Sequence, residues 1–174
     1  MWLRTRWSGV RIPPGAPNMP RTSANLNPPT KSMSDSTVRT NAHGVEVFSG
    51  QIFSWDEIDR IRLDEDQSEA QLISGEQMHL VRAVFEPGTT YPMHSHPHEQ
   101  FSLLLAGRIR LTVGDETREI GPGDGWYAAA NVLHGGEIIG DEAAVFVDIY
   151  SPATRWILDV LATGRKLPPR ITRE

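Results

Sequence analysis

The chain has 174 residues and no cysteine, so it suits one domain and excludes disulfides and thiolate-bound metal ions. Residues 1–41 carry six Lys or Arg against one acid, which leaves eleven basic and twenty-one acidic side chains in the rest. An acidic body of this kind disfavours nucleic acid and anionic membranes as partners, although a local arginine can still attract a small anionic substrate.

Residues 1–41 are expected to form a disordered tail, because they hold six prolines and show neither a helical nor a strand period. Residues 10–17, VRIPPGAP, can be encoded by a tRNA T-loop, acceptor stem and CCA end. Translation from Met19 or Met33 is therefore an alternative to a genuine tail from Met1. The chain lacks the apolar core of a secretory signal and any run of roughly 20 apolar residues, so we expect a cytoplasmic protein.

From residue 42 the pattern changes to short strands, and we expect one domain over residues 42–165 with a flexible tail at 166–174. The first strand is predicted at 43–51, and the acidic stretch 54–70 holds at most one helical turn, opening at Ser54 or Asp56. Further strands are predicted at 71–74, 78–86, 101–107, 108–114, 116–120, 126–130, 133–139 and 143–150.

Glycines separate several of these strands. Turns at Gly107 and Gly114 predict that residues 101–120 form an antiparallel meander. Apolar residues at helical spacing predict a helix within 152–164. Many short strands and a single C-terminal helix predict an all-β sandwich or barrel.

Polar side chains with metal-binding capacity gather in residues 94–100, HSHPHEQ. Because strand side chains alternate between faces, His94, His96 and Gln100 share one face of an extended segment. His134 begins another predicted strand, which antiparallel pairing could bring alongside. From the residues alone, these groups form either a metal site or the polar rim of a barrel.

A spacing pattern connects this segment with a known family. Gly88, five residues, His94-x-His96, three residues, Gln100, six residues and Gly107 resemble the first motif of the cupin family. The family's usual Glu is Gln100 here. Gly123-Asp124 and His134 resemble the second motif. At three of its other positions the chain departs from the family, with Ala129, Asn131 and Ile138.

The resemblance covers roughly residues 43–160 and implies a small double-stranded β-helix, or jelly roll. It also implies one divalent metal ion, held by His94, His96, Gln100 and His134. Zn, Ni, Mn, Fe and Cu all suit such ligands, so the identity stays open. Because the four ligands are neutral, the ion would keep its full charge and act as a stronger Lewis acid.

Within the cupins, the chain is similar to the pectin-degradation group that opens the rings of unsaturated uronates. That resemblance rests on HSHPHEQ, NVLHG and DIYSP, and implies conversion of 4,5-unsaturated uronates to the linear keto sugar. It gives Asp148 the role of the carboxylate that moves protons. Burial of Asp148 in an apolar strand would raise its pKa, while the alternative is a strand-end residue that caps a turn.

Substrate contacts are less well marked. The group has an arginine where this chain has Thr154, so Arg155 or Arg82 would have to hold the uronate carboxylate. Trp126 lines the sugar site or packs in the core. We expect Glu99 at the outer rim of the barrel, with support of a metal ligand as the alternative, while His98 is either a rim residue or a substrate contact.

Two other functions compete with the uronate enzyme. A redox-active iron or copper would suit a metal-dependent dioxygenase, and a site without turnover would suit a sugar-binding cupin. The resemblance further implies a homodimer, formed through the outer sheet and the N-terminal strand.

Overall fold

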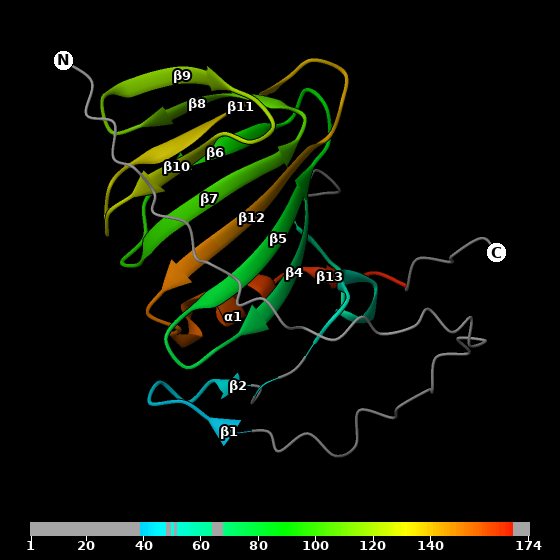
Figure 1. The fold of residues 1–174 in the computed structure, drawn as a ribbon, viewed down its shortest axis with the longest axis vertical. Helices are drawn as coiled ribbons and strands as arrows, with labels where there is room; N and C mark the ends of the chain where they lie inside the picture. Colours follow the sequence, from blue (N-terminus) through cyan, green and yellow to red (C-terminus); the bar gives the residue numbers. More distant parts are fainter. Residues whose placement is uncertain (1–38, 48–49, 51, 64–67, 169–174) are drawn as a thin grey trace, which may run out of the picture. The chain divides into compact units, whose positions relative to one another are not determined.

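The computed structural model describes residues 39–47, 50, 52–63 and 68–168 (Figure 1). Most of the expected tail, with the alternative starts at Met19 and Met33, lies outside these residues. So does most of the expected C-terminal tail. Within the described part, strand β1 (Arg39–Thr40) pairs with β2 (Glu46–Val47), so strand structure begins inside the stretch 1–41 that was expected to be a tail. Of the strand predicted at 43–51, β2 covers only two residues among those described.

A seven-stranded sheet forms one side of the domain, with the order β10-β7-β12-β5-β4-β3-β13. All of its neighbouring strands are antiparallel. Its strands are β10 (Gly125–Ala128), β7 (Glu99–Ala106), β12 (Ala144–Ser151), β5 (His79–Phe85), β4 (Ser68–Ser74), β3 (Ile61–Leu63) and β13 (Arg165–Lys166).

A four-stranded sheet forms the other side, with the order β6-β11-β8-β9. Its strands are β6 (Thr90–His94), β11 (His134–Ile139), β8 (Arg108–Val113) and β9 (Glu116–Ile120). The predicted hairpin at Gly114 is confirmed, since β8 and β9 pair on either side of it. These two sheets confirm the predicted all-β barrel.

The predicted meander is wrong at Gly107. β7 belongs to the seven-stranded sheet and β8 to the four-stranded sheet, so the chain crosses between sheets at this glycine. Gly107 has φ +74°, and a Cβ atom there would lie 2.6 Å from the carbonyl oxygen of Ala143. Only glycine tolerates both the left-handed backbone and this close approach.

The acidic stretch 54–70 holds more structure than predicted. Ser54 caps the single 3-10 turn η1 (Trp55–Glu57), as expected, but β3 and the first residues of β4 follow it. Glu69 of β4 is buried and forms ion pairs with Arg60, at 2.6 Å, and with Arg62. These pairs let a charged sequence form a partly buried strand pair.

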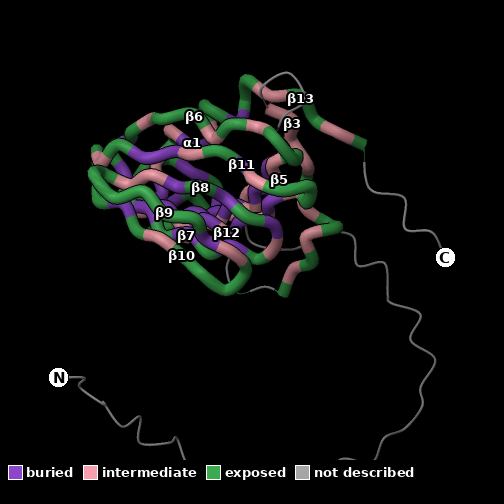
Figure 2. Tube along the Cα trace, turned by 90° about the horizontal axis from the view of Figure 1, so that it is seen from above, coloured by how far each residue is buried: buried purple, intermediate pink, exposed green. Residues whose placement is uncertain are grey.

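The main core lies between the two sheets, and Figure 2 shows the buried residues gathered there. Its buried members come from both sheets: Ala83, Leu104, Ile109, Leu111, Ile120, Ile138, Ala144 and Phe146. The outward face of β7 is different, because Phe101, Leu103 and Leu105 are each about half exposed.

A short helix, α1 (Arg155–Leu161), confirms the predicted C-terminal helix, with Thr154 as its N-cap. Ile157 and Leu161 of α1 pack on Ala70, Val81 and Tyr150 of the seven-stranded sheet, and so form a second apolar cluster. In the described ranges, no helix is both long and apolar enough to cross a membrane.

Candidate metal centre

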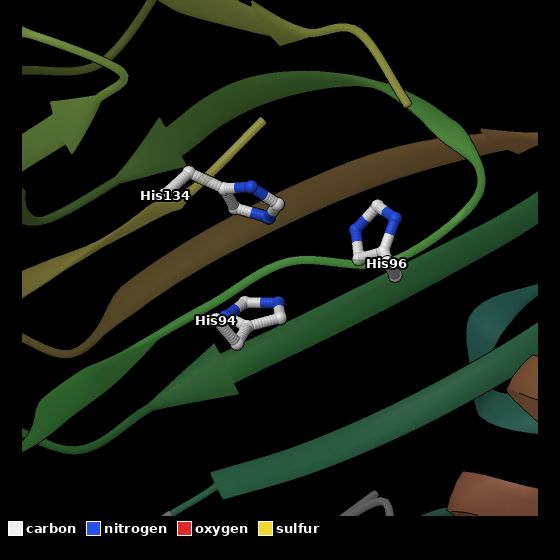
Figure 3. Close-up of side chains that lie close together, drawn as sticks. All are labelled: His94, His96 and His134. Carbon is white, nitrogen blue, oxygen red and sulfur yellow. The ribbon is translucent and has the colours of Figure 1, made fainter. Parts of the chain in front are cut away.

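Three histidines from separate segments meet inside the barrel. His94 ends β6, His134 begins β11, and the register of these strands pairs the two residues. His96 lies in the connection that follows β6. Each of the three residues offers a ring nitrogen, and these nitrogens lie within 4.8 Å of one another. Figure 3 shows the three rings turned toward a common space.

The backbone orients all three rings in the same way. Each Nδ1 atom lies near a carbonyl oxygen two residues away: His94 at 2.8 Å from Pro92, His96 at 3.0 Å from His98, and His134 at 2.8 Å from Val132. A carbonyl oxygen only accepts, so Nδ1 carries the proton in each neutral ring. The Nε2 lone pairs are thereby directed to the shared space, as in histidines that bind metal ions.

The Nε2 atom of His134 is buried and has no hydrogen-bond partner. Burial lowers the pKa of His134 to about 4, assisted by the neighbouring His94 and His96 and opposed by the Val132 carbonyl. Burial also lowers the pKa of His94. Both rings are therefore neutral near pH 7. A buried lone pair without a partner is what a bound cation satisfies.

Gln100, on β7, lies beside the histidines. Its Oε1 atom is 2.9 Å from Nε2 of His96, while its Nε2 atom donates to Oγ of Ser102 at 2.9 Å. Ser102 in turn donates to Asp148, and this chain fixes which end of the amide faces His96. In the neutral site two lone pairs then face each other, an arrangement that a shared cation stabilises.

Asp148 of β12 is buried opposite Ser102 in the β7–β12 register. Burial raises the pKa of Asp148 to about 6, and the hydrogen bonds from Ser102 and Gln100 partly offset that rise. Burial, together with the nearby Asp148, also raises the pKa of Tyr91 and of Tyr150. Both phenols therefore keep their protons at neutral pH.

These donors fit a divalent metal ion. Three imidazole nitrogens suit Zn, Ni, Cu and Fe, and the amide oxygen of Gln100 also tolerates Mn. Residue alternation predicted that His94, His96 and Gln100 share a face, and pairing of β6 with β11 brings His134 to them. The residues thus fit the expected ion, whose identity the donor set leaves open.

A cavity of about 280 Å³ adjoins this centre. His94 and Asp148 line it, together with residues of β4, β5 and α1. Among the described residues that line this cavity there is no lysine or arginine.

The structure does not bring two of the expected substrate-binding residues to the histidines. Arg82 alternates with the inward-facing Val81 and Ala83, so it lies on the other face of β5, where it donates to Gln71 at 3.1 Å and lines a separate cavity of about 360 Å³ beside η1. Arg155 begins α1 and donates to the carbonyl of Gly44 at 3.3 Å.

Trp126 does reach the site. Its ring centroid lies 5.0 Å from that of His134, and it packs against the main core. Glu99 is exposed and accepts a hydrogen bond from Tyr127 at 3.3 Å, as an outer-rim position predicts.

His98 is fully buried, so it is not a rim residue. Its Nε2 atom lies 2.5 Å from Oγ1 of Thr154, and its ring lies 5.3 Å from that of Trp156. His98 therefore connects the segment that carries His96 to the start of α1.

Two residues near the centre were missed from the sequence. Ser102 shares the inward face of β7 with Gln100, and strand alternation could have found it. Tyr91 of β6 places its hydroxyl 3.5 Å from Nε2 of His94. Nothing in its sequence neighbourhood distinguishes Tyr91 from a core aromatic residue.

Comparisons with known proteins concern the family and the fold of the chain. Residues 81–150 match a family model described as the cupin domain. An uncharacterised protein of Streptomyces coelicolor is 28% identical over 100 residues, which cover 58% of this chain and 94% of that protein. H2HPP isomerase of Bacillus subtilis is 30% identical over 91 residues, which cover 47% of this chain but only 39% of the isomerase.

Solved structures share the fold. KdgF from Halomonas sp. aligns with a TM-score of 0.54 at 23% identity, over 59% of this chain and 94% of KdgF. An RmlC-like cupin from Shewanella frigidimarina aligns with a TM-score of 0.53 at 23% identity, over 60% of this chain and 93% of that one. Residues 81–150 are thus similar to the cupin domain, and the chain shares the β-barrel fold of these cupin structures.

Proposed function

We propose that this protein is a metal-dependent enzyme that moves a proton on a small anionic substrate bearing carbonyl or carboxylate oxygens. The observation that carries the proposal is the buried chain from Asp148 through Ser102 to Gln100, which ends beside three histidines with directed Nε2 lone pairs. A titratable carboxyl group next to a Lewis-acid site is an arrangement suited to acid–base chemistry.

The proposed cofactor is one divalent ion held by His94, His96, His134 and Gln100. When bound, such an ion polarises a carbonyl oxygen and stabilises the charge that develops on it. Bacillus subtilis oxalate decarboxylase, which shares the fold, has Mn(II) centres, and this supports a divalent metal ion as the proposed cofactor.

Asp148 would serve as the acid–base group. A carboxyl group with a pKa of about 6 can take up a proton from carbon or oxygen and release it again near neutral pH. The hydroxyl of Ser102 donates to Asp148 and holds the carboxylate in one orientation. The protonated phenols of Tyr91 and Tyr150 are the neighbouring donors.

Ring opening and ketonisation of 4,5-unsaturated uronates is the specific version of this reaction that the sequence resemblance suggests. The likeness to KdgF and to H2HPP isomerase gives that version loose support. The positions of Arg82 and Arg155 do not add to it, because neither lines the cavity beside the histidines.

The test uses metal-free protein reloaded separately with Mn, Ni, Zn and Fe. Loss of the conjugated double bond of a 4,5-unsaturated galacturonate is followed by absorbance, and exchange of the carbon-bound protons of 2-oxohexanoate with deuterated solvent by NMR. We expect metal-dependent proton transfer in at least one assay, unchanged in the His43→Ala control, whose side chain is exposed. Oxygen consumption would instead indicate a dioxygenase, and metal binding without either reaction a binding protein.

The expected homodimer is also a proposal, supported by the exposed outward face of β7. Phe101, Leu103 and Leu105 form an apolar strip there. Tyr127 of β10 extends the strip, since its ring centroid lies 4.6 Å from that of Phe101. Such patches commonly mark association sites. We expect a dimer by light scattering, which Leu103→Glu converts to a monomer and Thr117→Glu, on exposed β9, leaves unchanged. A wild-type monomer at high concentration would contradict this.

A further inference from the structure

The cavity beside the metal centre is mainly apolar. Apart from two tyrosines and one tryptophan, the polar side chains of its described lining are Ser68, His94 and Asp148. The remaining lining residues are Leu63, Ala70, Val81, Ala83, Phe85, Tyr91, Pro92, Tyr150, Trp156, Ile157, Val160 and Leu161.

Two walls of this cavity come from different elements. Val81 and Ala83 belong to β5, while Trp156, Ile157, Val160 and Leu161 lie at helical spacing on α1. α1 therefore turns its apolar face toward the sheet and the cavity. Val160 is 38% exposed, so it lies where the cavity meets the surface.

Polar and apolar groups of this cavity serve different parts of a ligand. A ligand that places oxygen atoms near His94 has its remaining atoms against carbon-rich walls. Hydroxyl groups placed against Val81, Ala83, Ile157 and Leu161 would lose hydrogen bonds to water without gaining partners, whereas methylene groups would gain from leaving water. The lining thus discriminates against a polyhydroxylated chain.

We propose that this cavity binds the apolar side group of a carbonyl acid whose oxygen atoms lie at the metal centre. The inference rests on the proposed function and specifies its substrate class: a 2-oxo acid or similar enolisable acid with a hydrocarbon substituent. Asp148 lines the same cavity, so its carboxyl group is next to the carbon atoms that join the head of such a ligand to its side group.

The test measures calorimetric affinities of the metal-loaded protein for pyruvate, 2-oxobutanoate, 2-oxopentanoate and 2-oxohexanoate, with galacturonate as the polar comparator. Each added methylene is expected to tighten binding by about fourfold until the cavity is filled. 2-Oxohexanoate is expected to bind more tightly than galacturonate.

Val160→Glu places a charge at the rim without disturbing the buried core. In this variant, affinity should increase less with each added methylene group. 2-Oxohexanoate should bind at least about tenfold more weakly than to the wild type, while pyruvate affinity and metal content stay unchanged. Ala162→Glu adds the same charge at the C-cap of α1, an exposed position outside the cavity lining, and it should keep the wild-type affinities across the series.

The two proposals fail differently. Equal affinities across the series, or tighter binding of galacturonate than of 2-oxohexanoate, would overturn the apolar assignment even if the metal-loaded protein catalyses proton transfer. The proposed reaction would instead be overturned if the wild-type protein did not retain a metal ion. It would also be overturned if no proton transfer occurred although affinity still increased with each added methylene group.

Discussion

Replacement of His134 with alanine is expected to abolish stoichiometric metal binding. His134 supplies one of three directed Nε2 atoms, and its lone pair is the buried one without a protein partner. Loss of groups that merely orient a ligand weakens metal affinity by about 10- to 100-fold, so loss of a ligand itself should exceed about 100-fold. Metal analysis after dialysis measures this directly.

Thermal unfolding provides a second measurement of the same effect. A metal ion at 100 times its dissociation constant stabilises the folded protein by about 2.7 kcal/mol, so the wild-type melting temperature should rise on metal addition. The His134→Ala protein should show no such rise. His43→Ala removes an exposed histidine that is not one of the three clustered ones, and it should respond like wild type. Full metal content in His134→Ala would show that the ion binds elsewhere.

The second large effect is expected from Asp148→Asn, which should lower turnover by about 100- to 10,000-fold. The amide has the same shape but cannot exchange a proton with the substrate. Because Asp148 is not one of the proposed ligands and reaches His96 through Ser102 and Gln100, metal content should stay at the wild-type level. Turnover within about threefold of wild type would exclude Asp148 as the acid–base group.

The same substitution gives a pH-dependent stability difference in the metal-free protein. Folding raises the pKa of Asp148 from 3.8 to about 6, so the folded state binds the proton more tightly. Protonation of Asp148 therefore stabilises the folded protein. This contribution to the free energy of unfolding is fully present below about pH 4 and is lost as the pH rises to about 6. Asp148→Asn should therefore be the more stable protein above pH 6, by about 2 to 3 kcal/mol, and the advantage should disappear near pH 3.

Urea unfolding of both proteins across this pH range measures the difference. The histidines titrate in the same range with the opposite sign, since burial lowers the pKa of His94 and His134. Their contribution is common to both proteins and cancels in the comparison. A difference that does not vary with pH would mean that Asp148 has an ordinary pKa.

Local periodicity was sufficient for part of the metal centre. His94 and His96 alternate and Gln100 follows in phase, so the two-residue period of an extended chain places them on one face. The helix at Arg155–Leu161 was equally accessible, because its apolar spacing and its polar N-cap, Thr154, are both local signals.

The face of β5 could not be assigned from its sequence. Apolar residues occupy both phases of the 79–85 segment, so alternation alone leaves open whether Arg82 points into the barrel. The pairing of β5 with β12 decides this, since it puts Val81 and Ala83 inward. Arg82 then lies on the opposite face, away from the histidines.

What the sequence by itself determined was most of the longer strands, the C-terminal helix and the shared face of His94, His96 and Gln100, since these follow from periods of two and 3.6 residues. It did not predict the short strands β3, β6 and β13. Only the tertiary structure decided that the chain changes sheets at Gly107, that pairing of β11 with β6 puts the expected ligand His134 opposite His94, and that Ser102 meets Asp148 across 46 residues. The physical reason is that strand partners are selected by hydrogen bonds and packing between distant segments, which local patterns do not encode.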